Sequence, residues 1–163
     1  MSSKQSPVRP LIAESLKDEV PEMFLLGFQE SPFHKNLGLE FALLEDYTVV
    51  VRLRKSQQLL GNVMRNMMHG GVISAAFDSA GGAVCMVNMY RKFQHLSGEE
   101  RAKKLVRICT IDLTVNYLAP AKDEEFDLSA RIVKLGGTIA HVAMEMHDMS
   151  GKLIATASGN FMV

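Results

Sequence analysis

The sequence predicts an α+β fold in which one long buried helix packs against an antiparallel sheet. Residues 70–90 are almost all apolar or small, over a length too great for one strand. Residues 107–163 instead alternate apolar and polar side chains, with turn sequences at intervals. Helices and strands do not alternate along the chain as they do in parallel βαβ folds. These observations together favour the α+β class.

The N-terminal part of the chain is expected to be helical. Apolar residues recur at helical intervals from Leu11 to Phe28, and Pro21 interrupts them, which predicts one bent or split helix. The period changes to two in residues 37–44 and 47–53, which predicts a β-hairpin. The chain has the length of one domain, residues 1–163, in which residues 1 to about 30 form a helical extension.

A helical wheel divides the helix expected at residues 70–90 into two faces. The face expected to pack against the sheet carries Ile73, Phe77, Ala80, Val84 and Val87. The opposite face gathers small residues around one carboxylate: Gly71, Ser74, Ala75, Asp78, Gly82 and Cys85. A large ligand can therefore approach Asp78.

The rest of the chain is expected to form one short helix and four strands. Ser97 and Glu100 have the spacing of a capping box, which predicts a helix start. In the strand that follows, alternation places Thr110, Asp112, Thr114 and Asn116 on one side and Ile111, Leu113, Val115 and Tyr117 on the other. Residues 126–135, 138–148 and 152–163 then form an antiparallel meander with a tight turn at Gly136-Gly137.

Charge and cysteine content exclude several classes of function. The 18 Lys and Arg residues balance the 18 Asp and Glu residues, so no global field attracts nucleic acid or an anionic membrane. Residues 1–20 show neither a signal peptide nor an anchor, and we expect no segment that spans a bilayer. Cys85 and Cys109 lack paired spacing, which predicts core thiols in a reducing cytoplasm. The five histidines lack metal-ligand spacing, so we expect no metal.

Asp78 is the first candidate for a catalytic residue because it is the only charged residue between Gly70 and Tyr90. Burial of an unpaired carboxylate costs free energy, so such a residue is retained mainly where it is paired or functional. The structural alternative is that Asp78 bonds a backbone amide or a neighbouring arginine.

The segment His69-Gly70-Gly71 immediately precedes and opens the same helix. Paired glycines let a ligand approach the backbone, and the amides of a first helical turn lack partners within the helix. An amide at this position suits a developing oxyanion, and one such donor is typically worth about 3 kcal/mol in a transition state. We expect the His69 ring to bond a backbone carbonyl and hold the loop.

With an aspartate nine residues after the histidine of His69-Gly70-Gly71, the sequence resembles the PaaI-like hotdog-fold thioesterases. The resemblance covers residues 31–163, including residues 110–120 and 148–155. It implies the hotdog fold, in which an antiparallel sheet wraps a long helix. It also implies hydrolysis of acyl-CoA thioesters with no cofactor besides the CoA that belongs to the substrate.

The resemblance also assigns roles to site residues. It implies that Asp78 is the catalytic carboxylate, as nucleophile or general base, and that Gly71 supplies the polarising amide next to His69. Asn62 orients water or the carbonyl, and Thr110 places a hydroxyl near the carboxylate. In many relatives the asparagine lies six residues before the histidine, where this chain has Val63, so Asn66 is an alternative to Asn62. The substrate contacts implied are Gly70, Ser74, Gly82, Lys134, Gly136, Gly137 and Thr138, of which Lys134 is the candidate for the CoA phosphates.

Helix geometry predicts a site shared between two chains. Gly71 and Asp78 lie about 10 Å apart along a helix axis, whereas a reacting carbon must lie about 3 Å from both groups. A reacting carbon can lie close to both groups if the Gly71 amide comes from one subunit and the Asp78 carboxylate from another. We therefore expect a homodimer, or a homotetramer built as a dimer of dimers.

Two other functions are compatible with the same residues. One is a non-catalytic acyl-CoA-binding module, and the other is an enoyl-thioester hydratase that uses His69 and Asp78. For the acyl group we expect medium or long aliphatic chains, in a tunnel lined by Phe24, Phe28 and methionines. The methionines around the key helix are Met64, Met67, Met68, Met86 and Met89.

Overall fold

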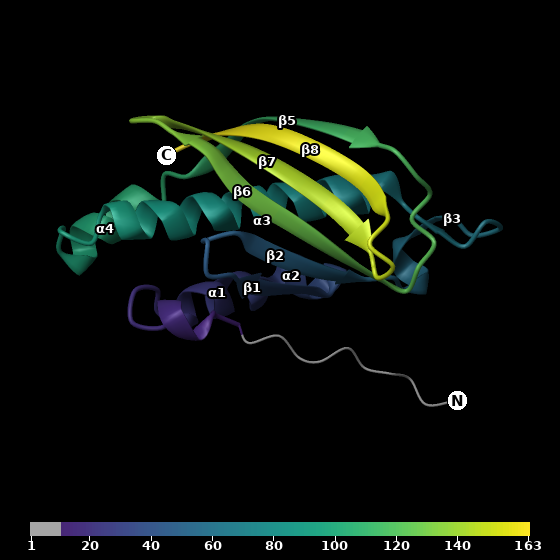
Figure 1. Ribbon diagram of the computed structural model, residues 1–163, viewed down its shortest axis with the longest axis horizontal. Helices are drawn as coiled ribbons and strands as arrows, with labels where there is room; N and C mark the ends of the chain where they lie inside the picture. The colour runs from purple at the N-terminus through teal and green to yellow at the C-terminus, as the bar shows by residue number, and fades with distance from the viewer. Residues whose placement is uncertain (1–10) are drawn as a thin grey trace.

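The computed structural model describes residues 11–163 and has one curved sheet wrapped around a long helix (Figure 1). The six strands are antiparallel and lie in the order β1-β2-β6-β7-β8-β5. Their bounds are Leu39–Leu43 (β1), Val49–Arg54 (β2), Cys109–Tyr117 (β5), Glu125–Leu135 (β6), Ile139–Asp148 (β7) and Leu153–Met162 (β8). The predicted α+β hotdog architecture, the hairpin and the meander are confirmed.

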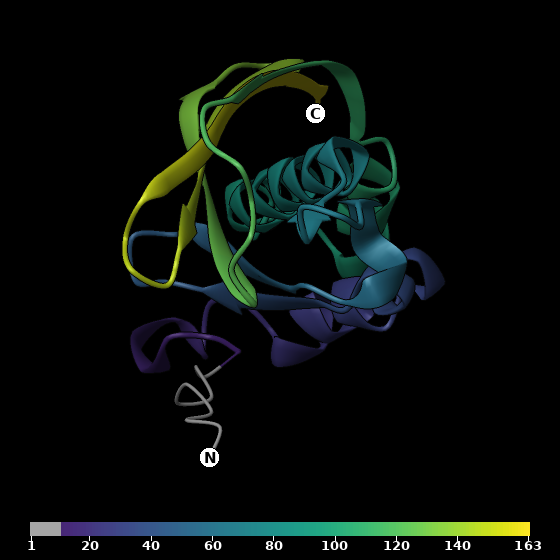
Figure 2. The ribbon, with the colours of Figure 1, turned by 90° about the vertical axis from the view of Figure 1, so that its right-hand side faces the viewer.

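The long helix α3, Gly70–Lys92, runs through the concave side of the sheet (Figure 2). All five residues of the predicted sheet-facing stripe are buried, among them Phe77 and Val84 with no exposed surface. The short helix α4, Gly98–Leu105, follows, and its start has the predicted capping box between Ser97 and Glu100. A small hairpin of β3, Leu60–Asn62, and β4, Met67–Met68, precedes α3, after the short 3-10 helix η2, Gln57–Leu59.

Helix α3 corrects one expectation about membranes. By length and composition alone it is long and apolar enough to cross a bilayer, whereas we expected no such segment. However, 56% of its most apolar 18-residue window is buried inside the fold. A helix enclosed by a sheet needs apolar residues on most of its sides, so its composition matches its place in the core.

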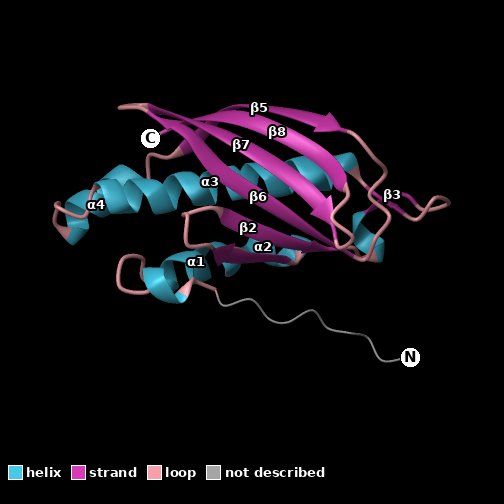
Figure 3. Ribbon diagram, in the orientation of Figure 1, coloured by secondary structure: helices cyan, strands magenta, loops and turns pink. Residues whose placement is uncertain are grey.

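The N-terminal segment is split, as Pro21 predicted. It forms a 3-10 helix η1 at Glu14–Leu16, then α1 at Glu22–Gln29 and α2 at Pro32–Leu37. These helices flank the edge strand β1 (Figure 3). Helix α1 also reaches α3, because the rings of Phe24 and Tyr90 lie 5.0 Å apart. Residues 1–10, part of the predicted extension, lie outside the described residues.

The two cysteines differ in exposure, which corrects the prediction that both are core thiols. Cys85 on α3 is buried, whereas Cys109 at the start of β5 is exposed. Burial raises the pKa of the Cys85 thiol to about 12. A thiol with a raised pKa stays neutral near pH 8 and is a poor nucleophile.

A chemical test of this difference uses a Cys109→Ser background, in which Cys85 is the only thiol. We expect no reaction of the native variant with a thiol reagent at pH 8 and stoichiometric reaction in denaturant. Rapid labelling of the native variant would contradict the burial of Cys85.

Two adjacent glycines of α3 have opposite surroundings, and we expect opposite effects of alanine on stability. A Cβ at Gly81 would overlap the ring of Phe161, whereas a Cβ at Gly82 meets no atom within 4 Å. Gly82→Ala should stabilise the fold by up to about 1 kcal/mol through helix propensity. Gly81→Ala should destabilise it by about 1–3 kcal/mol through overpacking. Urea unfolding measures both, and shifts of the same sign would contradict the packing.

Candidate active site

The first turn of α3 is capped by the ring of His69. Gly71 donates its backbone N–H to His69 Nδ1 at 2.8 Å. The prediction that this ring bonds a carbonyl is therefore wrong, because Nδ1 accepts from an amide. An accepting Nδ1 in a neutral ring leaves the proton on Nε2. The predicted oxyanion donor, the Gly71 amide, is thus already hydrogen-bonded to the ring of His69 within the chain.

The carboxylate of Asp78 is exposed within the chain, which corrects the expectation that it is buried. Thr110 Oγ1 on β5 donates to Asp78 Oδ1 at 2.7 Å. The structure therefore brings together two residues that lie 32 positions apart in the sequence. The hydroxyl holds one carboxylate oxygen and thereby orients the other, Oδ2.

A β-bulge in β5 places Thr110 and Asp112 on opposite faces. The register of β5 against β8 shifts between Thr110 and Asp112. Asp112 instead accepts from Asn160 Nδ2 at 2.9 Å, while Leu113 packs against the hydrophobic core. Simple alternation placed Thr110 and Asp112 on one face, and this prediction is wrong because the extra residue, Ile111, reverses the side.

Tyr117 is a site residue that the sequence analysis missed. Its hydroxyl donates to the carbonyl of Gly70 at 2.9 Å and contacts the hydroxyl of Ser74. The Tyr117 ring also lies over Gly70, where a Cβ would come within 3.4 Å of it. Alternation indicated only an apolar face for this residue. The available signal was the phenol, because a tyrosine hydroxyl at such a face needs a polar partner.

Asn62 lies in the β3–β4 hairpin just before α3. Its side-chain oxygen accepts from the backbone amide of Arg65 at 3.0 Å, so it holds the hairpin turn. Asn66, the alternative, adopts the left-handed conformation with φ of 48° in the same turn. The structure gives both asparagines a place in the turn and brings neither into contact with Asp78 in one chain.

Four of the residues predicted to contact the substrate lie near the far end of α3, in and around the β6–β7 turn. The β6–β7 turn contains Gly136, whose carbonyl accepts from Lys92 Nζ at 3.0 Å. Lys92 ends α3 and lies 14 residues after Asp78, about 21 Å along the axis. Within one chain the structure therefore does not bring the turn to the carboxylate. The predicted substrate contacts in and around this turn are Lys134, Gly136, Gly137 and Thr138.

The continuity of α3 separates the two halves of the proposed chemistry. Gly71 and Asp78 lie on the same uninterrupted helix, so the amide and the carboxylate are about 10 Å apart along its axis. One chain cannot place both within about 3 Å of one carbon. The Gly71 amide and the Asp78 carboxylate of one chain can therefore belong to two different sites.

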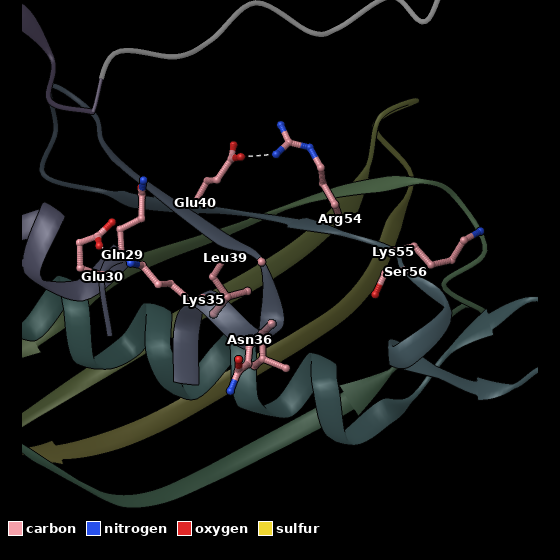
Figure 4. A pocket seen from close by; sticks show the side chains of 11 residues that line it. Gln29, Glu30, Lys35, Asn36, Leu39, Glu40, Arg54, Lys55 and Ser56 are labelled. Carbon is pink, nitrogen blue, oxygen red and sulfur yellow. Dashed lines mark hydrogen bonds and ion pairs between the residues drawn. The ribbon is translucent and has the colours of Figure 1, made fainter. Parts of the chain in front are cut away.

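A hollow of about 420 Å³, lined mostly by polar residues, lies away from these residues, between α2, β1 and the end of β2 (Figure 4). Its charged side chains are paired: Glu40 with Arg54, Glu30 with Lys35, and Lys55 with Glu124. No candidate site residue lines it. Within residues 11–163, no three His, Cys, Asp or Glu side chains are placed to hold a metal ion.

Comparisons with known proteins agree with this architecture. Residues 65–155 match the thioesterase superfamily. The chain is 32% identical to the medium/long-chain acyl-CoA thioesterase YigI of Escherichia coli strain K12, over 94% of this chain and 97% of YigI. The crystal structure of a Shewanella oneidensis protein related to the thioesterase superfamily superposes with a TM-score of 0.83 at 28% identity, covering 93% and 99% of the two chains.

The PaaI protein of Escherichia coli shares the fold at a TM-score of 0.66 and 18% identity, over 84% of this chain and 87% of PaaI. The extent of the match to YigI and of the superfamily match establishes the family. The chain belongs to the thioesterase superfamily.

Proposed function

We propose that this protein hydrolyses medium- and long-chain acyl-CoA thioesters to free acid and CoA. The observation that carries the proposal is the Thr110–Asp78 contact, which presents an oriented carboxylate on the helix whose first turn bears the Gly71 amide. The similarity to YigI over nearly the whole chain supports the substrate class. We also propose that the enzyme acts in the cytoplasm and needs no cofactor besides the CoA of its substrate.

In this mechanism Asp78 acts through Oδ2, because Thr110 holds Oδ1. The carboxylate either attacks the thioester carbon or removes a proton from water that attacks it. The carbonyl oxygen becomes negative in either case. When the carbon–sulfur bond breaks, the CoA sulfur leaves and takes up a proton, and water supplies the hydroxyl of the acid.

The amide that stabilises the oxyanion belongs to the Gly71 of a second subunit in this proposal. The 10 Å separation within one helix requires this arrangement, so the smallest active unit is a homodimer, alone or within a tetramer. The thioester oxygen shares the Gly71 N–H with the ring of His69, as three-centre hydrogen bonds allow. Tyr117 and Ser74 hold the same helix start in position.

A panel of acyl-CoA substrates tests the proposed function. We expect release of free thiol from acyl-CoA and rates that rise from acetyl-CoA to medium and longer chains. Crotonyl-CoA tests the hydratase alternative, because hydration removes the conjugated double bond without releasing thiol. Binding without thiol release across the panel would indicate an acyl-CoA-binding module, and a preference for acetyl-CoA would contradict the chain-length proposal.

A further inference from the structure

One stripe of α3 is only partly covered by the sheet and by the N-terminal helices. Every residue of this stripe is at least partly exposed, whereas most other residues of the helix are buried. Apart from the adjacent Ser74 and Ala75, successive members lie three or four positions apart, so they form one continuous ridge. The stripe consists of Gly71, Ser74, Ala75, Asp78, Gly82, Met86 and Tyr90.

Gly82 leaves the middle of this stripe without a side chain. It lies one helical turn beyond Asp78, and a Cβ added there meets no atom of the chain within 4 Å. A glycine inside a helix costs roughly 1 kcal/mol relative to alanine. Packing requires a glycine at Gly81, under Phe161, but packing within the chain does not require one at Gly82. Because no side chain covers the backbone at Gly82, the surface there suits a ligand that passes close to the helix backbone.

The stripe leads from Gly82 to an apolar hollow of about 380 Å³ beneath the N-terminal helices. Met86 forms its wall on α3, and Phe24 and Phe28 form its wall on α1. The remaining lining residues are Gly27, Ser31 and His34. The ring of His34 stacks on Phe28 and its Nδ1 contacts the Phe28 carbonyl at 2.6 Å, which ties α2 to α1. The volume lies within the range of about 300–1,000 Å³ that is usual for small-molecule sites.

We infer that the acyl tail runs from Asp78 across Gly82 and ends in the hollow between Met86 and Phe24. This inference rests on the proposed hydrolysis of acyl-CoA and assigns the site that measures chain length. Met86 lies about 12 Å from Asp78 along the helix axis. Carbon–carbon bonds of about 1.5 Å advance an extended chain by roughly 1.25 Å per carbon, so this path takes roughly ten carbons. The hollow then accommodates the end of a longer chain.

Two substitutions at different distances from Asp78 test the path. Gly82→Leu places a side chain about 6 Å along the axis, the length of roughly five carbons. Gly27→Leu fills the hollow from α1, where a Cβ also meets no atom within 4 Å. We expect Gly82→Leu to lower the ratio of decanoyl-CoA to butanoyl-CoA hydrolysis by about ten-fold or more. Gly27→Leu should lower the palmitoyl to butanoyl ratio while changing the decanoyl to butanoyl ratio much less.

Gly98→Leu is the matched control, because Gly98 is exposed at the start of α4 and also has open space around its Cβ. It should leave all ratios unchanged. Sedimentation and binding of a non-hydrolysable palmitoyl-CoA analogue accompany the assays, and Gly82→Leu should weaken this binding with assembly intact. Loss of assembly in Gly82→Leu, or equal effects on all chain lengths, overturns the path and leaves hydrolysis standing. A wild-type protein that hydrolyses no acyl-CoA overturns the proposed function itself.

Discussion

Asp78→Asn is expected to reduce the rate of the chemical step by at least about 10²- to 10⁴-fold. The substitution keeps the size of the side chain and one oxygen for Thr110, but it removes the negative charge that attacks the carbonyl or draws a proton from water. Substrate binding should persist, because the CoA and acyl contacts lie elsewhere. Single-turnover hydrolysis and equilibrium binding of a non-hydrolysable acyl-CoA separate the two effects.

The matched control is Asp112→Asn. Asp112 lies two residues from Thr110, but its carboxylate accepts a hydrogen bond from Asn160 and takes no part in the contact between Thr110 and Asp78. This variant should stay within a few-fold of wild type. If Asp78→Asn also hydrolyses within a few-fold of wild type, Asp78 has only a structural role. Thermal unfolding of both variants shows whether a loss of activity reflects a loss of folding.

Restoration of activity by mixing two inactive variants is the second large effect that we expect. Gly71→Pro removes the amide at the second helical position and also displaces the His69 ring, which lies 2.9 Å from a Cβ at this position, and Asp78→Asn removes the carboxylate. Each variant alone should be nearly inactive. In a mixed dimer, one site combines the intact Gly71 of one subunit with the intact Asp78 of the other, so an equal mixture should regain about one quarter of wild-type activity.

The exchange of subunits is measured independently, for example with two differently labelled chains. If subunits exchange and activity does not return, the amide and the carboxylate do not act in one shared site. If the protein sediments as an active monomer, the shared site is excluded directly. Either result leaves the Asp78→Asn prediction untouched.

Much of the fold was predictable because its signals are local. The length and apolar content of residues 70–90 identified α3, and the spacing of Ser97 and Glu100 located the start of α4. Pro21 identified the break between the N-terminal helices, since proline cannot continue a helix. The assignment of residues 1–163 to one domain stays a prediction, although Ile12 and Phe126 share one hydrophobic core.

The errors concern properties that depend on neighbours distant in the sequence. Asp78 was expected to be buried because its helix is apolar, but the sheet and N-terminal helices leave its stripe open. The role of His69 depends on which backbone group meets its ring, and the polar contacts of Tyr117 depend on the approach of β5 to α3. Among the predicted methionines, Met86 lines the apolar hollow, whereas Met64 is 99% exposed. Periodicity carries none of this information.

The extra residue at the bulge, Ile111, lies outside the strand pairing that directs Thr110 toward Asp78. The side chain of Ile111 is 53% exposed, so exchanging it for another residue changes few contacts. Deleting it would leave Thr110 opposite Phe161 and Asp112 opposite Asn160 in a regular register, so the Thr110 hydroxyl would still face Asp78. The contact between Thr110 and Asp78 therefore depends on the pairing of Thr110 with Phe161, and the edge strand can lose one residue at Ile111 without losing this contact.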